Sequence, residues 1–220
     1  MPFAAYIDAG PWALVSNSPE CLLASDGDRV ATFPIKGTRR RDPGSAAEAV
    51  AAALYADPKE QAEHVMVVDL ERNDLGRVCT PGSIAVAELA AVRHYPALVH
   101  MSSEVCGRLR RGISPAALLR AIFPGGSISG APKVRAMQLI EELEPAARGF
   151  YTGAIGWTEP GGATRFSIAI RTAVLDAAST TYWSGGGIVA DSRPDREYDE
   201  TLLKSETFFR ALASLEGRPA

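Results

Sequence analysis

Residues 42–64, "DPGSAAEAVAAALYADPKEQAEH", decide the fold class, because they predict a helical segment between two groups of strand-like segments. Ser45 is suited to cap the start of this helix, and Pro58 predicts a break that divides it in two. Residues 65–70, "VMVVDL", form a continuous apolar run that predicts a buried strand. The following "ERNDLGRV" predicts the turn that leaves this strand.

Short apolar segments on both sides of this stretch complete the prediction. Gly, Pro and Asp turns separate the first of them, which suggests an antiparallel meander. Strands are predicted at 3–8, 12–16, 21–25, 29–35, 83–91, 94–108, 151–158, 163–175 and 179–184. Further helices are predicted at 114–122, where Ser114 and Pro115 suit the first turn, after Pro132, and at 195–213. Strand runs with inserted helices predict an α+β fold with antiparallel sheets and flanking helices, in one domain over residues 1–220.

Composition excludes several classes of protein. The 220-residue chain is 46% apolar with a net charge of −3, so nothing indicates a nucleic-acid partner. No apolar run is long enough for a membrane span, and the N-terminus lacks a signal-peptide pattern. The cysteines, Cys21, Cys79 and Cys106, are odd in number and have no CxxC spacing, so neither a disulfide framework nor a zinc site is expected. A cytoplasmic location is predicted.

One lysine raises the first question about function. In "FPIKGTRRR" (33–41), Lys36 stands between an apolar run and a Gly-Thr turn. Taken alone, it is interpreted as a solvated side chain at the end of a strand, because surface lysines are common there. The arginines that follow it precede Asp42 and indicate a solvated loop rather than a binding patch.

Two glutamate pairs share a spacing of three residues on predicted helices. Glu60 and Glu63 form one pair, and Glu197 and Glu200 form the other. Residues with this spacing lie on one helical face, so each pair could present two carboxylates to a Mg²⁺ ion. The alternative is structural, because acidic residues favour a helix start and Glu200 with Lys204 has the spacing of a surface ion pair.

Other polar features are less specific. "PGGSISGAPK" (124–133) lacks both the P-loop ending and the dinucleotide glycine pattern, although its backbone N–H groups suit an anion. The glycines of "SGGGIVADS" (184–192) allow a close approach to a ligand or form a turn. His64, His94 and His100 have no metal-ligand partner at helical spacing, and no serine or cysteine nucleophile constellation is present.

The order of these motifs resembles the chorismate-utilising enzymes, which include anthranilate synthase component I, aminodeoxychorismate synthase component I and the isochorismate and salicylate synthases. The resemblance covers roughly residues 3–212. It rests on "SNSPE", "PIKGT", "KEQAEHVMVVDLERNDLGRV", "FPGGSISGAPKVRAMQLIEELEP", "RGFYTGAIGW", "FSIAIRTA" and "GGGIVADSRPDREYDETLLK". The fold it implies is the C-terminal part of the chorismate-binding α/β sandwich.

The resemblance assigns a role to the paired glutamates. It implies that Glu63 and Glu200 are direct Mg²⁺ ligands, while Glu60 and Glu197 hold metal-bound water. The metal would engage the ring carboxylate of chorismate as Lewis acid and template.

The resemblance also implies a set of substrate contacts. Tyr151 and Arg171 match residues that bind the enolpyruvyl carboxylate, Arg171 with a bidentate fork. Other expected substrate contacts and catalytic groups are the backbone of Gly185, Gly186 and Gly187, the amine of Lys204, Thr38 in the pocket wall, His100 near the reacting ring, and Glu20 as general acid or base at the carbon 4 hydroxyl.

Lys36 can be reinterpreted within this family. Anthranilate synthases usually read PIAGT at this point, whereas the aminodeoxychorismate synthase branch reads PIKGT. In that branch the lysine is the proposed nucleophile, which requires a neutral amine that burial or neighbouring cations favour. The resemblance therefore implies amination of chorismate at ring carbon 4 to 4-amino-4-deoxychorismate, on the route to 4-aminobenzoate and folate, with ammonia from a glutaminase subunit.

Two alternatives stay open. Anthranilate synthase component I would aminate carbon 2 and release pyruvate, and Lys36 argues against it. The second is a truncated, non-catalytic chain that binds chorismate or a partner, because the sequence starts after the long N-terminal portion of family members. "SPECLL" also has Cys21 where arginine is frequent, a minor departure.

Overall fold

The computed structural model describes residues 2–41, 44–95 and 98–215. Contacts between residues divide the chain into two compact units. The first comprises residues 1–19, 146–155 and 168–220, and the second comprises residues 20–145 and 156–167. The predicted mixture of helices and antiparallel sheets is confirmed.

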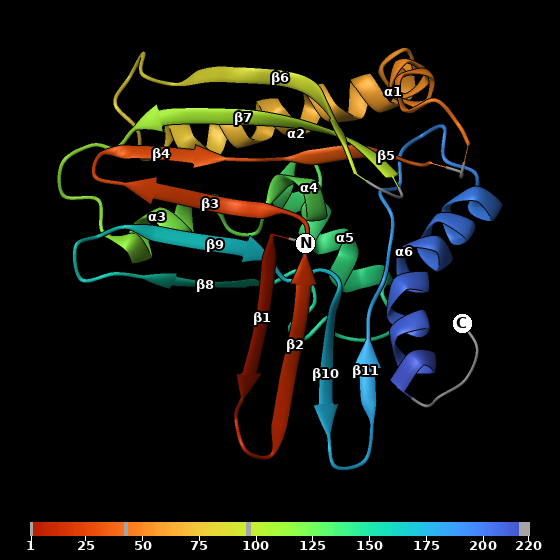
Figure 1. The fold of residues 1–220 in the computed structure, drawn as a ribbon. Coiled ribbons are helices and arrows are strands. Elements are labelled where there is room, and N and C mark those ends of the chain that lie inside the picture. The colour runs from red at the N-terminus through yellow and green to blue at the C-terminus, as the bar shows by residue number, and fades with distance from the viewer. Residues whose placement is uncertain (1, 42–43, 96–97, 216–220) are drawn as a thin grey trace. The chain divides into compact units, whose positions relative to one another are not determined.

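The second unit is built on a sheet that has seven strands among the described residues (Figure 1). The strand order is β5-β7-β4-β3-β9-β8, with β6 also paired to β7. The strands are β3 (Cys21–Asp26), β4 (Arg29–Thr32), β5 (Ile35–Arg40), β6 (Ala85–His94), β7 (Leu98–Arg108), β8 (Ala154–Thr158) and β9 (Thr164–Ile168). The long strand β7 therefore connects β5, β4 and β6.

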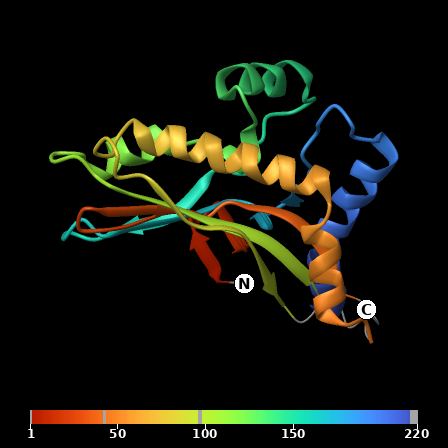
Figure 2. The ribbon, with the colours of Figure 1, turned by 90° about the horizontal axis from the view of Figure 1, so that it is seen from above.

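Two helices follow β5 in the chain, α1 (Ala47–Tyr55) and α2 (Pro58–Gly76). Figure 2 shows α2 lying across one face of the sheet. A buried apolar cluster beneath α1 joins these elements through Leu54, Ala90, Val99 and Met101. Helix α2 contacts β5 and β7 directly, so its sheet-facing side chains lie over the PIKGT strand.

The strand predicted at 65–70, with a turn after it, is wrong because α2 continues through both segments. The buried residues of α2 recur at helical spacing, as His64, Val67, Val68, Glu71, Asp74 and Leu75. Val65 and Met66 lie between them and are 46% and 37% exposed. A continuous apolar run does not distinguish a buried strand from a helix, and here it bridges the buried and exposed faces of one helix.

The start of the helical segment also differs from the prediction. Residues 42–43 lie outside the described residues, and α1 begins after Ala46, whose side chain makes no capping bond, rather than at a Ser45 cap. The predicted break at Pro58 is confirmed, because Pro58 begins α2. Asp57 is the cap of α2, and its side chain accepts hydrogen bonds from the N–H groups of Lys59 and Glu60.

Replacing Asp57 with alanine is expected to lower the free energy of unfolding by about 1–2 kcal/mol, because the first turn of α2 loses its cap. Asp57 Oδ1 lies 3.0 Å from the N–H nitrogen of Lys59, and Oδ2 also pairs with Arg39 at 2.8 Å. Urea unfolding would measure the loss. Asp57→Asn keeps the cap without the charge and should cost clearly less. Equal losses in the two variants would contradict the capping role.

Two predicted strands are each divided in the structure. The strand predicted at 29–35 ends at Thr32, and β5 starts after Pro34 because proline cannot donate to a ladder. The strand predicted at 163–175 is interrupted before β10, where Arg171 has φ +54°. Part of the predicted strand at 94–108 (residues 96–97) lies outside the described residues.

Two further helices of the second unit agree with prediction, and a third, short helix lies where only a turn was predicted. Helix α3 (Pro115–Ile122) is capped by Ser114, whose hydroxyl accepts from the N–H of Ala117. A short helix, α4 (Gly126–Ser129), occupies the glycine-rich segment, and α5 (Lys133–Leu143) follows Pro132 as expected. Lys133 reaches back to Asp74 of α2 in an ion pair of 2.5 Å.

The first unit contains a four-stranded antiparallel sheet among its described residues and one long helix. Its strand order is β1-β2-β10-β11, so the predicted meander is divided between two sheets. The elements are β1 (Phe3–Asp8), β2 (Trp12–Ser18), β10 (Thr172–Asp176), β11 (Thr180–Tyr182) and α6 (Pro194–Leu215). No described helix in either unit has the length and apolar character that crossing a bilayer requires.

Candidate active site

The PIKGT segment forms an irregular part of β5. Lys36 pairs with Met101 and Thr38 with His100, and the register shifts between them at Gly37. Gly37 has φ +80°, a left-handed conformation that glycine adopts without steric cost. The Lys36 side chain is half-buried, and within the described residues its amine forms no hydrogen bond or ion pair. Lys36 therefore lies inside β5, near the start of that strand, rather than after the end of the strand predicted at 29–35.

Helix α2 lies close above this irregular point. A Cβ atom on Gly37 would lie 3.2 Å from Glu60 Oε2 and 3.0 Å from Leu54 Cδ1. The Glu60 carboxylate is thus directed at the backbone beside Lys36. Glu63, on the same helix, pairs with Lys59 at 3.8 Å and its side chain is 14% exposed. The helix face that carries Glu60 and Glu63 is therefore partly buried in the second unit.

Replacing Gly37 with alanine is expected to destabilise the chain by about 2–3 kcal/mol, through backbone strain and the two close contacts. Gly112→Ala is a matched control, because Gly112 has φ +81° and an added Cβ would meet nothing within 4 Å. The control should lose only the strain, about 1–2 kcal/mol. Chemical unfolding of both variants would measure the difference, and equal losses would argue against tight packing at Gly37.

Two other predicted catalytic residues lie beside Lys36 in the same unit. Glu20 is 4% exposed, and its Oε1 accepts a hydrogen bond of 3.3 Å from the N–H of Ile35. His100 is 5% exposed, and its Nδ1 lies 2.7 Å from Thr38 Oγ1. The Tyr95 ring packs edge-on against His100 at 5.5 Å. A buried carboxyl, an amine and an imidazole–hydroxyl pair therefore occur around β5.

A second histidine, His64, lies on the buried face of α2 and was not predicted to have a role. It is fully buried, and its Nε2 lies 2.6 Å from Ser103 Oγ on β7. Burial lowers the pKa of His64 to about 4, while a hydrogen bond to the Lys36 backbone raises it and the Lys36 charge lowers it. The ring is therefore neutral near pH 7 and lies close to Lys36.

Another buried carboxyl, Glu71, was assigned to a turn by the sequence reasoning and so escaped notice. It is 3% exposed. Burial raises the pKa of Glu71 to about 8; the hydroxyl of Thr32 lowers it, and the negative charges of Glu20 and Asp74 raise it further. Burial also raises the pKa of Asp74, while its pair with Lys133 opposes the shift. Glu71 is therefore a protonated acid near neutral pH, within electrostatic reach of Glu20.

The predicted substrate-binding residues of the first unit also lie together. A Cβ atom on Gly185 would lie 3.0 Å from the hydroxyl of Tyr151, and the Lys204 amine donates to the Gly185 carbonyl at 3.1 Å. Arg171 donates to the Lys204 carbonyl at 2.6 Å. Its φ of +54° is a strained conformation for a residue with a side chain, and such strain concentrates at functional sites. Backbone, amine, hydroxyl and guanidinium donors, which are groups that can bind carboxylates, thus lie near one another in this unit.

Glu197 and Glu200 converge over the glycine segment of this unit. From the position of a Cβ atom on Gly186, Glu197 Oε2 is 3.4 Å away and Glu200 Oε1 is 4.0 Å away. Glu197 is 9% exposed, whereas Glu200 is exposed and pairs with Lys204 at 2.5 Å. A cavity of about 350 Å³ is lined by Gly186, Ile188, Val189, Ser192, Pro194, Glu197, Tyr198 and Thr201.

These two carboxylates suit a hard cation. Mg²⁺ prefers carboxylate oxygens and typically takes one or two from a protein, leaving positions for water and an anionic substrate. The two carboxylates near Gly186 fit this preference of Mg²⁺. The Glu200–Lys204 ion pair also fits the structural alternative, in which Glu200 only forms an ion pair at the surface of the helix. Among the described residues, no three His, Cys, Asp or Glu side chains gather as a complete metal site. The predicted Glu60 and Glu63 belong to the second unit and Glu197 and Glu200 to the first.

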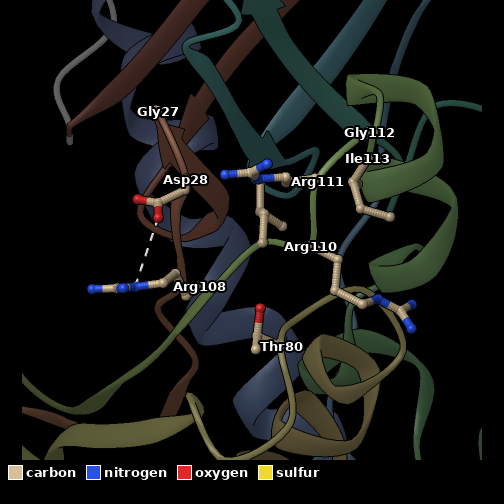
Figure 3. Close-up of a pocket in the computed structure, with 9 residues that line it drawn as sticks. Gly27, Asp28, Thr80, Arg108, Arg110, Arg111, Gly112 and Ile113 are labelled. Carbon is tan, nitrogen blue, oxygen red and sulfur yellow. Dashed lines mark ion pairs between the residues drawn. The ribbon is translucent and has the colours of Figure 1, made fainter.

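A larger cavity of the second unit does not contain the predicted site. It has a volume of about 430 Å³ and is lined by the β3–β4 turn and the segment after β7. Figure 3 shows that its three arginine side chains point in different directions, with Arg108 paired to Asp28 at 3.6 Å. The guanidinium groups of Arg108, Arg110 and Arg111 therefore do not converge on one point of the cavity.

The chain matches the model of the chorismate binding enzyme family over residues 1–210. It is 45% identical over 212 residues to aminodeoxychorismate synthase component 1 of Bacillus subtilis, covering 96% of this chain and 45% of that protein. It is also 45% identical over 216 residues to anthranilate synthase component 1 of Thermus thermophilus, covering 98% of this chain and 47% of that protein. The chain thus spans about half the length of the curated relatives it matches.

Solved structures of the same family are also similar to this chain. Anthranilate synthase component I from Streptococcus pneumoniae is 39% identical with a TM-score of 0.83, covering 93% of this chain and 45% of that one. A putative 2,3-dihydroxybenzoate-specific isochorismate synthase from Bacillus anthracis is 30% identical with a TM-score of 0.85, covering 96% of this chain and 57% of that one. The family match and these relatives confirm the resemblance inferred from the motifs, and the chain belongs to the chorismate binding enzyme family.

Proposed function

We propose that this chain aminates chorismate at ring carbon 4 to form 4-amino-4-deoxychorismate, on the route to 4-aminobenzoate and folate. The observation that carries the proposal is Lys36 at the irregularity of β5, half-buried and without an ion pair among the described residues. An amine paired with a carboxylate would be held in its charged form, which cannot act as a nucleophile. A glutaminase subunit would supply the ammonia and the cytoplasm would be the location.

The proposed reaction exchanges hydroxyl for amine in two steps. The Lys36 amine forms a bond to ring carbon 2, both conjugated ring double bonds shift by one position toward carbon 4, and the carbon 4 hydroxyl leaves as water with a proton from Glu20. Ammonia then bonds to carbon 4, both double bonds shift back, and the bond between carbon 2 and the Lys36 amine breaks. The Glu20 carboxylate takes up the proton that the incoming nitrogen loses, so the acid is restored.

The other residues would bind and orient the substrate. Tyr151, Arg171, Lys204 and the backbone of Gly185–Gly187 would hold its carboxylates, and Thr38 and His100 would lie beside the ring. Glu63 and Glu200, with Glu60 and Glu197 through water, would hold Mg²⁺. When bound, that ion would withdraw electron density from the ring carboxylate.

Anthranilate synthesis is the second candidate, because anthranilate synthase components are among the relatives of equal similarity. The test is to incubate the purified chain with chorismate, MgCl₂ and ammonium at alkaline pH, and to identify products by liquid chromatography with mass spectrometry. Aminodeoxychorismate supports the proposal, whereas anthranilate with pyruvate overturns it. A folded chain that binds chorismate without turnover would instead be the non-catalytic alternative.

A further inference from the structure

Tyr151 places its hydroxyl at the glycine segment of the first unit. A Cβ atom on Gly185 would lie 3.0 Å from that hydroxyl, and the carbonyl of the same glycine accepts a hydrogen bond of 3.1 Å from the Lys204 amine. The Tyr151 side chain is only half-buried. Because a tyrosine hydroxyl lies at the far end of its side chain, a change of rotamer would carry it away from Gly185. Contacts to the ring are therefore needed to hold the hydroxyl in place.

Two side chains make such contacts with the Tyr151 ring. The Trp183 ring is nearly parallel to it, with an interplanar angle of 15° and a centroid distance of 6.4 Å, which is within the range of offset-stacked pairs. The guanidinium carbon of Arg148 lies over the Tyr151 ring, 5.8 Å from its centroid, at the distance of a cation–π contact. The ring is thus held by one aromatic and one cationic neighbour.

Arg148 also holds the main chain of Tyr151. Its guanidinium donates to Thr152 Oγ1 at 3.3 Å, and that hydroxyl donates to the Tyr151 carbonyl at 2.5 Å. In return, the Tyr151 N–H donates to the Arg148 carbonyl at 3.0 Å. One arginine therefore fixes both the backbone and the ring of Tyr151.

The residue after Tyr151 is in a strained conformation. Thr152 has φ +64°, which is an outlier for a β-branched residue. Such strain persists only where the surrounding contacts determine the conformation, and it concentrates at functional sites. Here the Thr152 N–H donates to the Ala169 carbonyl at 2.9 Å, in addition to the two hydrogen bonds of its hydroxyl. The turn that carries Tyr151 is therefore held in a conformation that threonine itself does not favour.

We propose that Arg148 and Trp183 are positioning residues that fix the Tyr151 hydroxyl for a carboxylate of the substrate. This inference rests on the proposed function, in which Tyr151 binds a carboxylate of chorismate. A donor that is already fixed loses less conformational entropy when the ligand binds, so the two contacts increase affinity. Binding of this kind is equal in the ground and transition states, and its loss raises KM while kcat is unchanged.

A double-mutant cycle tests whether the two residues act through the hydroxyl. Chorismate binding to the 220-residue chain is measured by isothermal titration calorimetry with MgCl₂ and without ammonium, so that no turnover is needed. The single variants are Tyr151→Phe, which loses only the hydroxyl, Arg148→Met and Trp183→Leu. Each of the last two is also combined with Tyr151→Phe. Arg210→Met, at an exposed arginine of α6, removes the same charge as a control, and circular dichroism measures folding.

The expected result is that the three sites do not add. Tyr151→Phe should raise the Kd by about 10-fold or more, the value of a hydrogen bond to a charged group. Arg148→Met and Trp183→Leu should each raise Kd and KM by at least about 3-fold with kcat within about 2-fold, and add less than about 1.5-fold once the hydroxyl is absent. Trp183→Phe keeps an aromatic ring and should bind like the unsubstituted chain. Equal effects with and without the hydroxyl, or no effect, would overturn the proposal.

The binding measurement separates this inference from the proposed function. If chorismate binds but no aminodeoxychorismate forms, the proposed function fails, and the cycle still decides whether the two residues act through Tyr151. If the unsubstituted chain does not bind chorismate, the chain is labelled with 3-fluorotyrosine, and the fluorine resonance of Tyr151 is assigned by its loss in Tyr151→Phe. A larger shift of this resonance in Arg148→Met than in Arg210→Met supports the positioning of the ring, and equal shifts overturn it. Failure of both Arg148→Met and Trp183→Leu to fold would make the two residues structural and would also overturn the proposal.

Discussion

Replacing Lys36 with alanine should lower the rate of aminodeoxychorismate formation by at least about 100-fold while leaving the chain folded. The side chain is half-buried and, among the described residues, makes no ion pair or hydrogen bond, so its removal costs little stability. Loss of a covalent nucleophile removes the pathway that divides one difficult displacement into two easier steps. The rate is measured with chorismate, MgCl₂ and ammonium, and folding by circular dichroism.

Two further measurements make this prediction specific. Lys36→Met keeps the length of the side chain without the amine and should be as inactive as Lys36→Ala. Acid quenching of the chain with chorismate, in the absence of ammonia, should trap an adduct on Lys36 with the mass of chorismate less one water. Arg111→Ala, an exposed cation of the same unit, should retain full activity. A Lys36→Ala chain with full activity would remove Lys36 from the mechanism.

The local part of the site could be predicted from the sequence. "PIKGT" is a continuous motif, and the structure places Lys36, Gly37 and Thr38 at one irregular point of one strand. The i, i+3 spacing of Glu60 and Glu63 predicted a shared helical face, because that geometry depends on the helix alone. Spacing could not predict that Glu60 would face Gly37, since that contact depends on how α2 packs on the sheet.

The most consequential error lay in residues 65–70. Interpreting "VMVVDL" as a strand ended the helix before Glu71 and assigned Glu71 and Asp74 to a turn, where acidic residues are ordinary and solvated. In the structure, α2 continues through this segment, and residues 64, 71 and 75 lie on its buried face. Glu71 is therefore buried, next to Thr32 and within reach of the charge of Glu20. The sequence pattern does not distinguish a buried Glu71 from a solvated one, because the apolar residues 65–70 before it fit a strand as well as a helix.

Replacing Glu71 with glutamine should stabilise the chain at alkaline pH and have little effect at acidic pH. Burial raises the pKa of Glu71 from 4.5 to about 8 in the folded chain. Between these values the folded chain keeps a proton that the unfolded chain has lost, so rising pH favours unfolding. The stability linked to this proton is complete below about pH 4.5 and is lost as the pH approaches about 8. Glutamine has no such proton to lose.

The difference in unfolding free energy between Glu71→Gln and the unsubstituted chain should therefore grow with pH. Its slope is at most about 1.4 kcal/mol per pH unit, and it levels off above about pH 8 at no more than about 5 kcal/mol. Urea unfolding at pH 5, 6, 7, 8 and 9 would measure it. Glu141→Gln, at an exposed residue of α5, should show no comparable trend. A difference that stays constant from pH 5 to 9 would mean that Glu71 is not a buried acid, and the electrostatic link between Glu71 and Glu20 would fail with it.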